Sequence, residues 1–329
     1  MRNKILIIAS FTIGLVMLFS FSVQEGNDTY EFLPLLSQYE LYQGTMADLN
    51  PSEGTELYEL TSHLFVDYSE KQRLLQLPAD SKMISKGNGL PDFPNGTIMV
   101  KTFFYYTDAA DPSLGKNIVE TRLMVKKDDL WSFGTYEWND RQTDAVLAED
   151  ETDVKVTYKD KTGNEQDIFF HIPSNEQCAE CHQQNDKNIP IGLKLRNMNF
   201  DVVKNGKSIN QLEYFKNIGW LDDVDHTTLS TLPNWEDSSQ PLGKRARAYM
   251  DMNCAHCHNP EGSSSNKRLD FNFETDFAAT GIQAKKDKIM MRILSDDEDD
   301  LRMPSLGITI NDVEGNEMVK EYLNSLPDN

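Results

Sequence analysis

Cysteine and positive charge are both scarce in this sequence of 329 residues. It has four cysteines, and its 32 lysine and arginine residues face 53 aspartate and glutamate residues, so the formal net charge is −21. A protein this acidic is a poor partner for nucleic acid or for an anionic membrane surface. The sequence also lacks a GxGxxG or P-loop fingerprint, which argues against a built-in nucleotide cofactor. Its surface suits basic partners instead.

Only one long hydrophobic run is present, and it stands at the N-terminus. Arg2 and Lys4 precede an uncharged run at 5–23, and polar residues follow it. This order predicts a secretory signal peptide at 1–24. The alternative is an uncleaved membrane anchor at 5–23, because 19 residues can just span a bilayer. In both cases we expect the bulk of the chain in the periplasm or otherwise outside the cytoplasm.

The four cysteines occur in two copies of one motif, CAECH at 178–182 and CAHCH at 254–258. A Cys₄ zinc site usually brings its two C-x-x-C pairs within about 15–20 residues, whereas 72 residues lie between these pairs. A thioredoxin-like site would need a β-α-β context that neither copy has. Disulfides are the remaining alternative for an exported protein.

C-x-x-C-H is the attachment signature of c-type haem. The two thiols reach the two vinyl groups of one porphyrin, and the adjacent histidine meets the iron as an axial ligand. The sequence therefore predicts two covalently bound haem c groups, and we expect His256, inside the second motif, to be a solvent-facing spacer. The predicted attachment and iron-binding residues are Cys178, Cys181 and His182 for haem 1, and Cys254, Cys257 and His258 for haem 2.

Met303 is the predicted sixth ligand of the haem 2 iron. It lies 45 residues after His258 in the loop DDLRMPSLG (299–307), and Pro304 would stiffen that loop. The alternative is a methionine that fills a gap in a core. For haem 1 the sixth ligand stays open, and the iron could also lack one. The candidates for that position are Met198, His226, His63 and His171.

The predicted fold is multidomain α+β, with an N-terminal antiparallel β-sandwich-like domain followed by α-helical cytochrome c-type haem segments. Alternating apolar residues predict the strands, and apolar residues at helical spacing predict the helices. The expected divisions are a β-rich domain at 25–173, a haem 1 segment at 174–240 and a cytochrome c-like haem 2 domain at 241–329. The predicted strands are 97–106, 117–127, 130–139, 153–160 and 166–173, and the predicted helices lie within 210–221, 241–258 and 316–326.

Two resemblances support this division. The stretch 241–329 resembles class I cytochrome c domains through CAHCH, RMPSLG and the final helix. Most of 60–329 is similar to a family of exported bacterial dihaem c-type cytochromes with an N-terminal β-domain, and this implies haem-mediated electron transfer without a known substrate. Met198 stands where we expect an aliphatic residue in relatives, so the resemblance does not support it as a ligand. The matching stretches are FPNGTIMVKTFFY, ETRLMV, TYEWNDRQTDA, PIGLKLRNMN, NQLEYF and ARAYMDMNCAHCHNPEG.

The leading interpretation is an electron carrier between redox partner proteins rather than an enzyme. An acidic run at 296–300 directly precedes Met303, so we expect it to dock a partner with a basic face. One alternative is a peroxidase-like enzyme with an open haem 1 iron and His226 or His171 as the acid–base group. In another, the β-domain binds carbohydrate and the chain delivers a dehydrogenase's electrons. Trp138, Asp140, Arg141 and Asp144 could line a binding surface, but we expect an ordinary strand end there.

Overall fold

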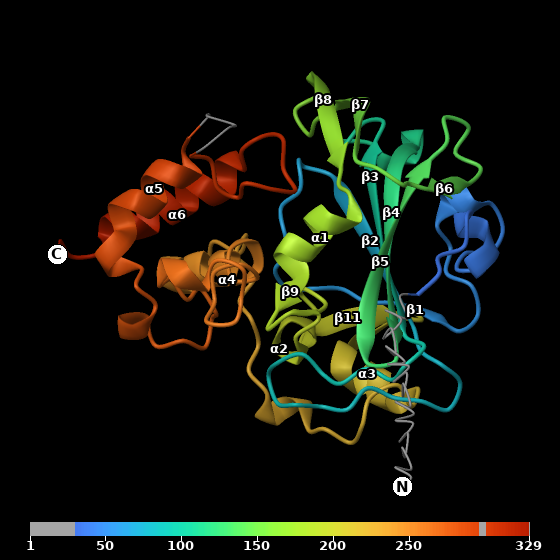
Figure 1. Ribbon diagram of the computed structural model, residues 1–329, viewed down its shortest axis with the longest axis horizontal. Coiled ribbons are helices and arrows are strands. Elements are labelled where there is room, and N and C mark those ends of the chain that lie inside the picture. Colours follow the sequence, from blue (N-terminus) through green and yellow to red (C-terminus); the bar gives the residue numbers. More distant parts are fainter. Residues whose placement is uncertain (1–29, 296–300, 329) are drawn as a thin grey trace, which may run out of the picture.

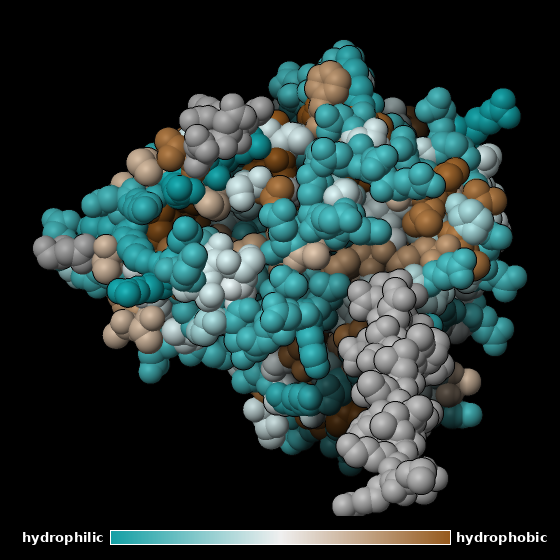
Figure 2. Space-filling view, in the orientation of Figure 1, coloured by the Kyte–Doolittle hydropathy of each residue, from teal (hydrophilic) through white to brown (hydrophobic). Residues whose placement is uncertain are grey.

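The computed structural model describes residues 30–295 and 301–328 (Figure 1). Two predictions fall outside these ranges, namely the signal peptide or anchor at 1–24 and the acidic run at 296–300. None of the helices in the described ranges combines the length and the hydropathy that crossing a bilayer requires. The face seen in Figure 2 is largely hydrophilic, and hydrophobic residues show through between the C-terminal helices and the sheet.

A six-stranded antiparallel sheet dominates the N-terminal half, and each strand pairs with the next one along the chain. Asp128 and Asp129 join the fourth and fifth strands with φ values of 51° and 62°, as a type I′ hairpin turn requires. The strands predicted at 97–106, 117–127 and 130–139 are present. The six strands are β1 (Thr55–Leu57), β2 (Glu70–Gln76), β3 (Ile98–Tyr106), β4 (Lys116–Lys127), β5 (Leu130–Trp138) and β6 (Ala145–Leu147).

The two faces of this sheet are covered by different parts of the chain. Along β3, Val100 and Phe104 pack with Leu36 and Leu49 from the N-terminal segment. On the other face, Phe103 packs against the hairpin of β7 (Thr152–Lys159) and β8 (Glu165–Ile172). The prediction of an α+β chain with mainly antiparallel strands is therefore confirmed, and the second layer described here is this hairpin.

Six α-helices follow or interrupt the strands within the described residues. Three of them, α3, α4 and α6, fall where apolar periodicity predicts helices. Two short hairpins, β9–β10 and β11–β12, lie between the first three helices. The bounds are α1 (Asn175–His182), β9 (Gln183–Gln184), β10 (Lys187–Asn188), α2 (Leu195–Met198), β11 (Asp201–Lys204), β12 (Lys207–Asn210), α3 (Gln211–Asn217), α4 (Leu242–Asn253), α5 (Lys286–Ile293) and α6 (Val313–Ser325).

Seven short 3₁₀ turns complete the described secondary structure. Two precede the sheet, one lies within it, and four accompany the helical part. They are η1 (Leu36–Tyr39), η2 (Met46–Asp48), η3 (Pro112–Leu114), η4 (His226–Thr228), η5 (Ser265–Lys267), η6 (Phe277–Ala279) and η7 (Gln283–Lys285).

Residues 174–240 share a hydrophobic core with the sheet. Met99 and Trp131 from the sheet pack in one buried cluster with Leu195, Met198 and Phe215 from this segment. In Figure 1, α1 lies between the sheet and the C-terminal helices. Ala248 and Met252 of α4 belong to the same cluster, so this segment packs against both the sheet and α4.

The C-terminal helices α4, α5 and α6 build a second core of their own. Tyr249 of α4 packs with Ile289 of α5 and with Met318 and Tyr322 of α6. A side chain at position 315 would collide with the Tyr249 ring, so Gly315 is what lets α6 approach α4 closely. The stripe predicted on the last helix is therefore buried as expected.

Candidate functional site

The first motif, residues 178–182, lies on α1. This short helix starts with a capping box, in which Ser174 Oγ accepts a hydrogen bond from Gln177 N and Gln177 Oε1 accepts one from Ser174 N. Cys178 and Cys181 are three positions apart on the helix, so their side chains lie on the same face one turn apart.

His182 closes α1 with one ring nitrogen already engaged. Its Nδ1 donates to the carbonyl oxygen of Ile189 at 2.7 Å, and its ring packs against Phe133 with centroids 5.0 Å apart. Burial lowers the pKa of His182 to about 3, so the ring is neutral. A neutral imidazole whose Nδ1–H donates to a carbonyl leaves the lone pair of Nε2 free to bind a metal. Histidines that bind metal ions usually donate their other ring N–H in this way.

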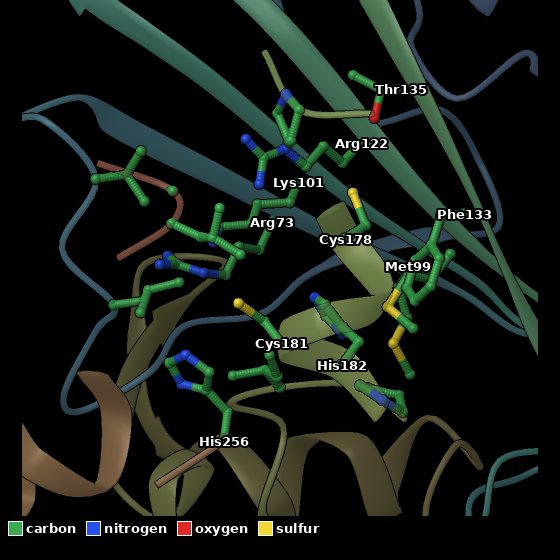
Figure 3. Close-up of a pocket in the computed structure, with 18 of the residues that line it drawn as sticks. Arg73, Met99, Lys101, Arg122, Phe133, Thr135, Cys178, Cys181, His182 and His256 are labelled. Atoms are coloured by element: carbon green, nitrogen blue, oxygen red, sulfur yellow. The ribbon is translucent and has the colours of Figure 1, made fainter. Parts of the chain in front are cut away.

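A cavity opens beside this motif, and we call it the first cavity. Its walls include Cys178, Cys181 and His182 from α1 and side chains from the face of the sheet that carries Met99 and Lys101 (Figure 3). The side chains of α1 point into the cavity from one side and the strands close it from the other.

Three basic side chains from neighbouring strands form a ladder on the sheet wall of the first cavity. Arg73 of β2 is paired with Lys101 of β3, and Lys101 is paired with Arg122 of β4. Arg122 forms an ion pair with the buried carboxylate of Glu120. Arg73 and Lys101 form no ion pair among the described residues. Burial lowers the pKa of both.

This ladder leaves the first cavity short of negative charge. Glu120 is the one carboxylate that forms an ion pair with any of the three basic groups among the described residues, and uncompensated buried charge is costly unless a counter-ion or a proton shift relieves it. A ligand with two carboxylates would balance Arg73 and Lys101. Sequence reasoning missed the ladder, although the alternation along β3 signals it. Lys101 falls in step with Met99 and Phe103 and therefore on a buried face.

The second motif, residues 254–258, follows α4 as a tight turn. Cys254 O accepts hydrogen bonds from Cys257 N at 3.3 Å and from His258 N at 2.9 Å. The buried Asn259 fixes this turn, because its Nδ2 donates to Ala255 O at 2.7 Å. The second motif thus begins at the residue that caps the C-terminus of α4, so this helix fixes where the motif lies.

A second cavity of about 400 Å³ lies against this motif. Cys254, Cys257, His258 and Met303 all line it, so the structure brings the predicted sixth ligand into the same space as the motif. Met303 N donates to Arg292 O at 3.1 Å, which ties the loop to the end of α5.

The remaining walls of the second cavity suit a large apolar group with acidic substituents. Both apolar and basic side chains line it. His258 packs edge-on against Phe271 with centroids 5.6 Å apart, and its buried Nδ1 has no hydrogen-bond partner among the described residues. Burial lowers the pKa of His258, so this imidazole is also held neutral. The apolar lining residues are Leu269, Phe271, Ile289, Ile293 and Leu306, and the basic ones are Lys267, Lys285, Lys288 and Arg292.

The two motifs lie side by side. The nearest side-chain ligand atoms of Cys181, His256 and Cys257 are all within 4.8 Å of one another. The backbone joins the same regions, because Asn185 N donates to Glu261 O at 3.2 Å and Gln184 forms a bridge with Gly262. The two cavities consequently share four wall residues, which are Cys181, His256, Pro304 and Leu306.

Cys181, His256 and Cys257 could also bind a metal ion directly. This arrangement would use one cysteine from each motif and would leave out Cys178, Cys254 and both motif-ending histidines. A structural zinc site normally has four protein ligands. The cluster therefore accounts for less of the repeated pattern than two haem sites do.

Of the four residues considered in the sequence as sixth ligands of haem 1, only one lines the first cavity. His171 lines the first cavity, but Asp153 and Gln177 engage its two ring nitrogens at 2.8 and 3.2 Å. Met198, His226 and His63 line neither cavity.

The expectation that His256 faces solvent is wrong, because the side chain lines both cavities and its Nδ1 is buried.

Two buried aspartates fix the helical part to the rest of the chain. Asp251 of α4 accepts hydrogen bonds from Arg196 Nη2 at 2.6 Å and from Phe273 N at 3.0 Å. Asp67, between β1 and β2, accepts from Thr309 N at 2.8 Å and from Ile310 N at 3.1 Å. The segment that follows the Met303 loop is thereby anchored to the connection between β1 and β2.

The aromatic and charged stretch at 135–145 is a strand end, as expected. Trp138 is 6% exposed and its Nε1 donates to Thr121 Oγ1 at 2.9 Å. Asp144 accepts hydrogen bonds from the backbone and hydroxyl of Ser37.

No protein-family model, curated protein or solved structure matches the chain.

Proposed function

We propose that this protein is an extracytoplasmic dihaem c-type cytochrome that transfers electrons between redox partner proteins. Haem c, when bound, supplies one-electron chemistry at its iron. The observation that carries the proposal is the contact between the motifs, because the sulfur atoms of Cys181 and Cys257, which would each bear one haem, lie within 4.8 Å of each other.

The residues of the first cavity fit haem 1. Cys178 and Cys181 would form the thioether bonds, and His182 would bind the iron through Nε2, since its Nδ1 is bound to Ile189 O. Arg73 and Lys101 would neutralise the two propionates that every haem c carries. This match between two unpaired cations and a dianionic ligand supports a haem over a zinc ion.

The residues of the second cavity fit haem 2. Cys254 and Cys257 would form the thioether bonds, and His258 and Met303 would bind the iron. The helices around this cavity, α4 to α6, follow the order expected for a cytochrome c-like domain, with one helix before the motif and one at the C-terminus. The apolar wall would keep water from the iron, which together with a methionine ligand favours a high potential.

The partner would be a redox protein with a basic face. The run at 296–300 carries five carboxylates three to seven positions before Met303. A concentrated negative field speeds the encounter with a basic partner more than it strengthens the complex. Export through the signal at 1–24 would place this exchange in the periplasm, or on the outer side of a membrane if the segment is retained as an anchor.

A redox titration of the matured full-length protein tests the proposal. Two centres held this close interact electrostatically, so oxidising one should raise the potential of the other. We expect haem 1 to titrate at a different potential in the variant Cys254→Ala with Cys257→Ala than in the parent. The reciprocal variant, Cys178→Ala with Cys181→Ala, should shift haem 2 as well. If the potential of each haem is the same with and without the other haem, the proposal of a paired electron-transfer unit is contradicted.

A further inference from the structure

The histidine inside the second motif reaches the cavity of the first. His256 stands between Cys254 and Cys257 in the sequence, yet its side chain lines the first cavity together with Cys178, Cys181 and His182. In Figure 3 it enters from the side opposite the strands that carry Arg73, Lys101 and Arg122. Its Nδ1 is buried and has no hydrogen-bond partner among the described residues.

We propose that His256 is the second axial ligand of haem 1, so that the motif holding one haem also completes the coordination of the other. The inference rests on the proposed function, since it requires a haem on Cys178 and Cys181. A histidine is a suitable ligand here, because a neutral imidazole nitrogen binds iron and is the commonest metal-binding side chain in proteins.

The other donors on the wall of the first cavity are already engaged. Asp153 and Gln177 bind both nitrogens of His171. Met252 Sδ accepts a hydrogen bond from Asn197 Nδ2 at 3.2 Å. Met99 and Met124 pack in the core cluster that also holds Met252.

Lys101 is the strongest competitor of His256. Its ammonium group lies 4.7 Å from the centroid of the Phe103 ring, and it stands in the ladder between Arg73 and Arg122. A position between two guanidinium groups suits the binding of an anion, and the variant Lys101→Ala, described below, tests Lys101 as the alternative ligand. The thiol of Cys257 is the hydrogen-bond partner of the His256 side chain, and that thiol would be consumed when the thioether bond to haem 2 forms.

The position of His256 is fixed by the turn of the second motif. Asn259 Nδ2 donates to His256 O at 3.3 Å and to Ala255 O at 2.7 Å, which holds the backbone on both sides of the Cα of His256. Cys181 lies within 4.8 Å of the ring, so His256 stands next to a sulfur that would bear haem 1.

A functional consequence follows from this ligation. Two histidines would hold haem 1, whereas His258 and Met303 would hold haem 2, and methionine raises the potential relative to histidine. Haem 1 would then be the low-potential centre and haem 2 the high-potential centre. Electron flow would run from the sheet side of the molecule towards the loop that carries Met303.

Electron paramagnetic resonance and visible spectra of the variant His256→Ala test the inference. Mass spectrometry should still count two haems on the variant. We expect one haem to change from low-spin to high-spin ferric, and added imidazole should restore the low-spin signal. The variant His256→Met should stay low-spin and show a higher haem 1 potential. His226→Ala is the matched control and should leave both haems low-spin, because His226 lines neither cavity.

A second background keeps the test decisive if His256→Ala disturbs the neighbouring haem. In Cys254→Ala with Cys257→Ala only haem 1 remains, and it should be low-spin with His256 and high-spin without it. A low-spin haem 1 after removal of His256, or a high-spin haem 1 caused by Lys101→Ala, overturns the inference and leaves the proposed function standing. Absence of both haems from the parent protein would instead overturn the proposed function.

Discussion

The side chains of Cys181 and Cys257 lie within 4.8 Å of each other, although 76 positions separate them in the sequence. The two come from different copies of the C-x-x-C-H motif, one at the end of α1 and one just after α4. Backbone contacts between Asn185 and Glu261 hold the same regions together. The fold thus makes one site out of two sequence motifs.

Met303 should control the potential of haem 2. Replacing Met303 with His should lower that potential, because histidine stabilises ferric iron more than a thioether does. The change should also abolish the weak long-wavelength absorption band that sulfur–iron ligation gives in ferric cytochromes. Met291→Ala is the control, since Met291 is 49% exposed on α5. The assignment is wrong if the band survives in Met303→Ala.

The basic ladder should raise the potential of haem 1. Arg73→Gln or Lys101→Gln removes a positive charge from the wall of the first cavity, and ferric iron is then less destabilised. We expect the potential of haem 1 to fall in each variant, with a smaller change at haem 2, as measured by spectroelectrochemistry. Lys155→Gln serves as the control, because Lys155 is an exposed residue of β7. Equal potentials in all four proteins would show that the ladder does not face the haem.

Asp251 should stabilise the joint between α4 and the haem 1 segment. Its side chain is 1% exposed and pairs with Arg196, whose side chain is 3% exposed. Removing one partner of a buried pair typically costs about 3–5 kcal/mol, so Asp251→Ala should lower the free energy of unfolding by that order. Glu317→Ala removes an exposed partner of Lys320 and should cost no more than about 0.5 kcal/mol. Urea unfolding curves compare the two, and equal losses would refute the role of Asp251.

His63 should make the folded state less stable as the solution becomes acidic. Burial, with Arg73 and Lys71 nearby, lowers the pKa of His63 from 6.5 to about 4. Between pH 6.5 and about 4, His63 is protonated in the unfolded chain but not in the folded chain. The contribution of His63 to the free energy of unfolding is therefore complete above pH 6.5 and is lost as the pH falls towards 4.

The variant His63→Gln cannot take up this proton. One pKa unit corresponds to about 1.4 kcal/mol, so its loss of stability over the same interval should be smaller than that of the parent by roughly 3 kcal/mol. The measurement is the free energy of unfolding at several pH values, with His226→Gln as the control. Parallel curves for parent and His63→Gln would contradict the assignment.

The parts of the fold that local pattern decides could be predicted from the sequence. The long strands β3 to β5 are rich in β-branched and aromatic residues, and the final helix has an apolar stripe that includes Met318 and Tyr322. The β11–β12 hairpin was missed, although Asn205–Gly206 at its turn is the strongest short-range hairpin signal there is. Asn205 and Gly206 have φ values of 52° and 74°, as such a turn requires.

The arrangement of the site could be predicted only in part. The spacing within each motif predicts which residues hold each haem, and the loop context of Met303 predicts its approach to the second motif. The contact of Cys181 with Cys257 and the orientation of His256 depend on how α1 packs between the sheet and α4. Nothing local to either motif encodes that packing.

Mass spectrometry of the full-length chain, expressed with a cytochrome c maturation system, tests the central claim most directly. The account predicts a mass increased by two haems, which persists under denaturing conditions because the bonds are covalent. Cys254→Ala with Cys257→Ala should lose one of the two haems and keep the other. A chain without haem, with its cysteines paired as disulfides or with a zinc ion bound by Cys181, His256 and Cys257, would contradict it.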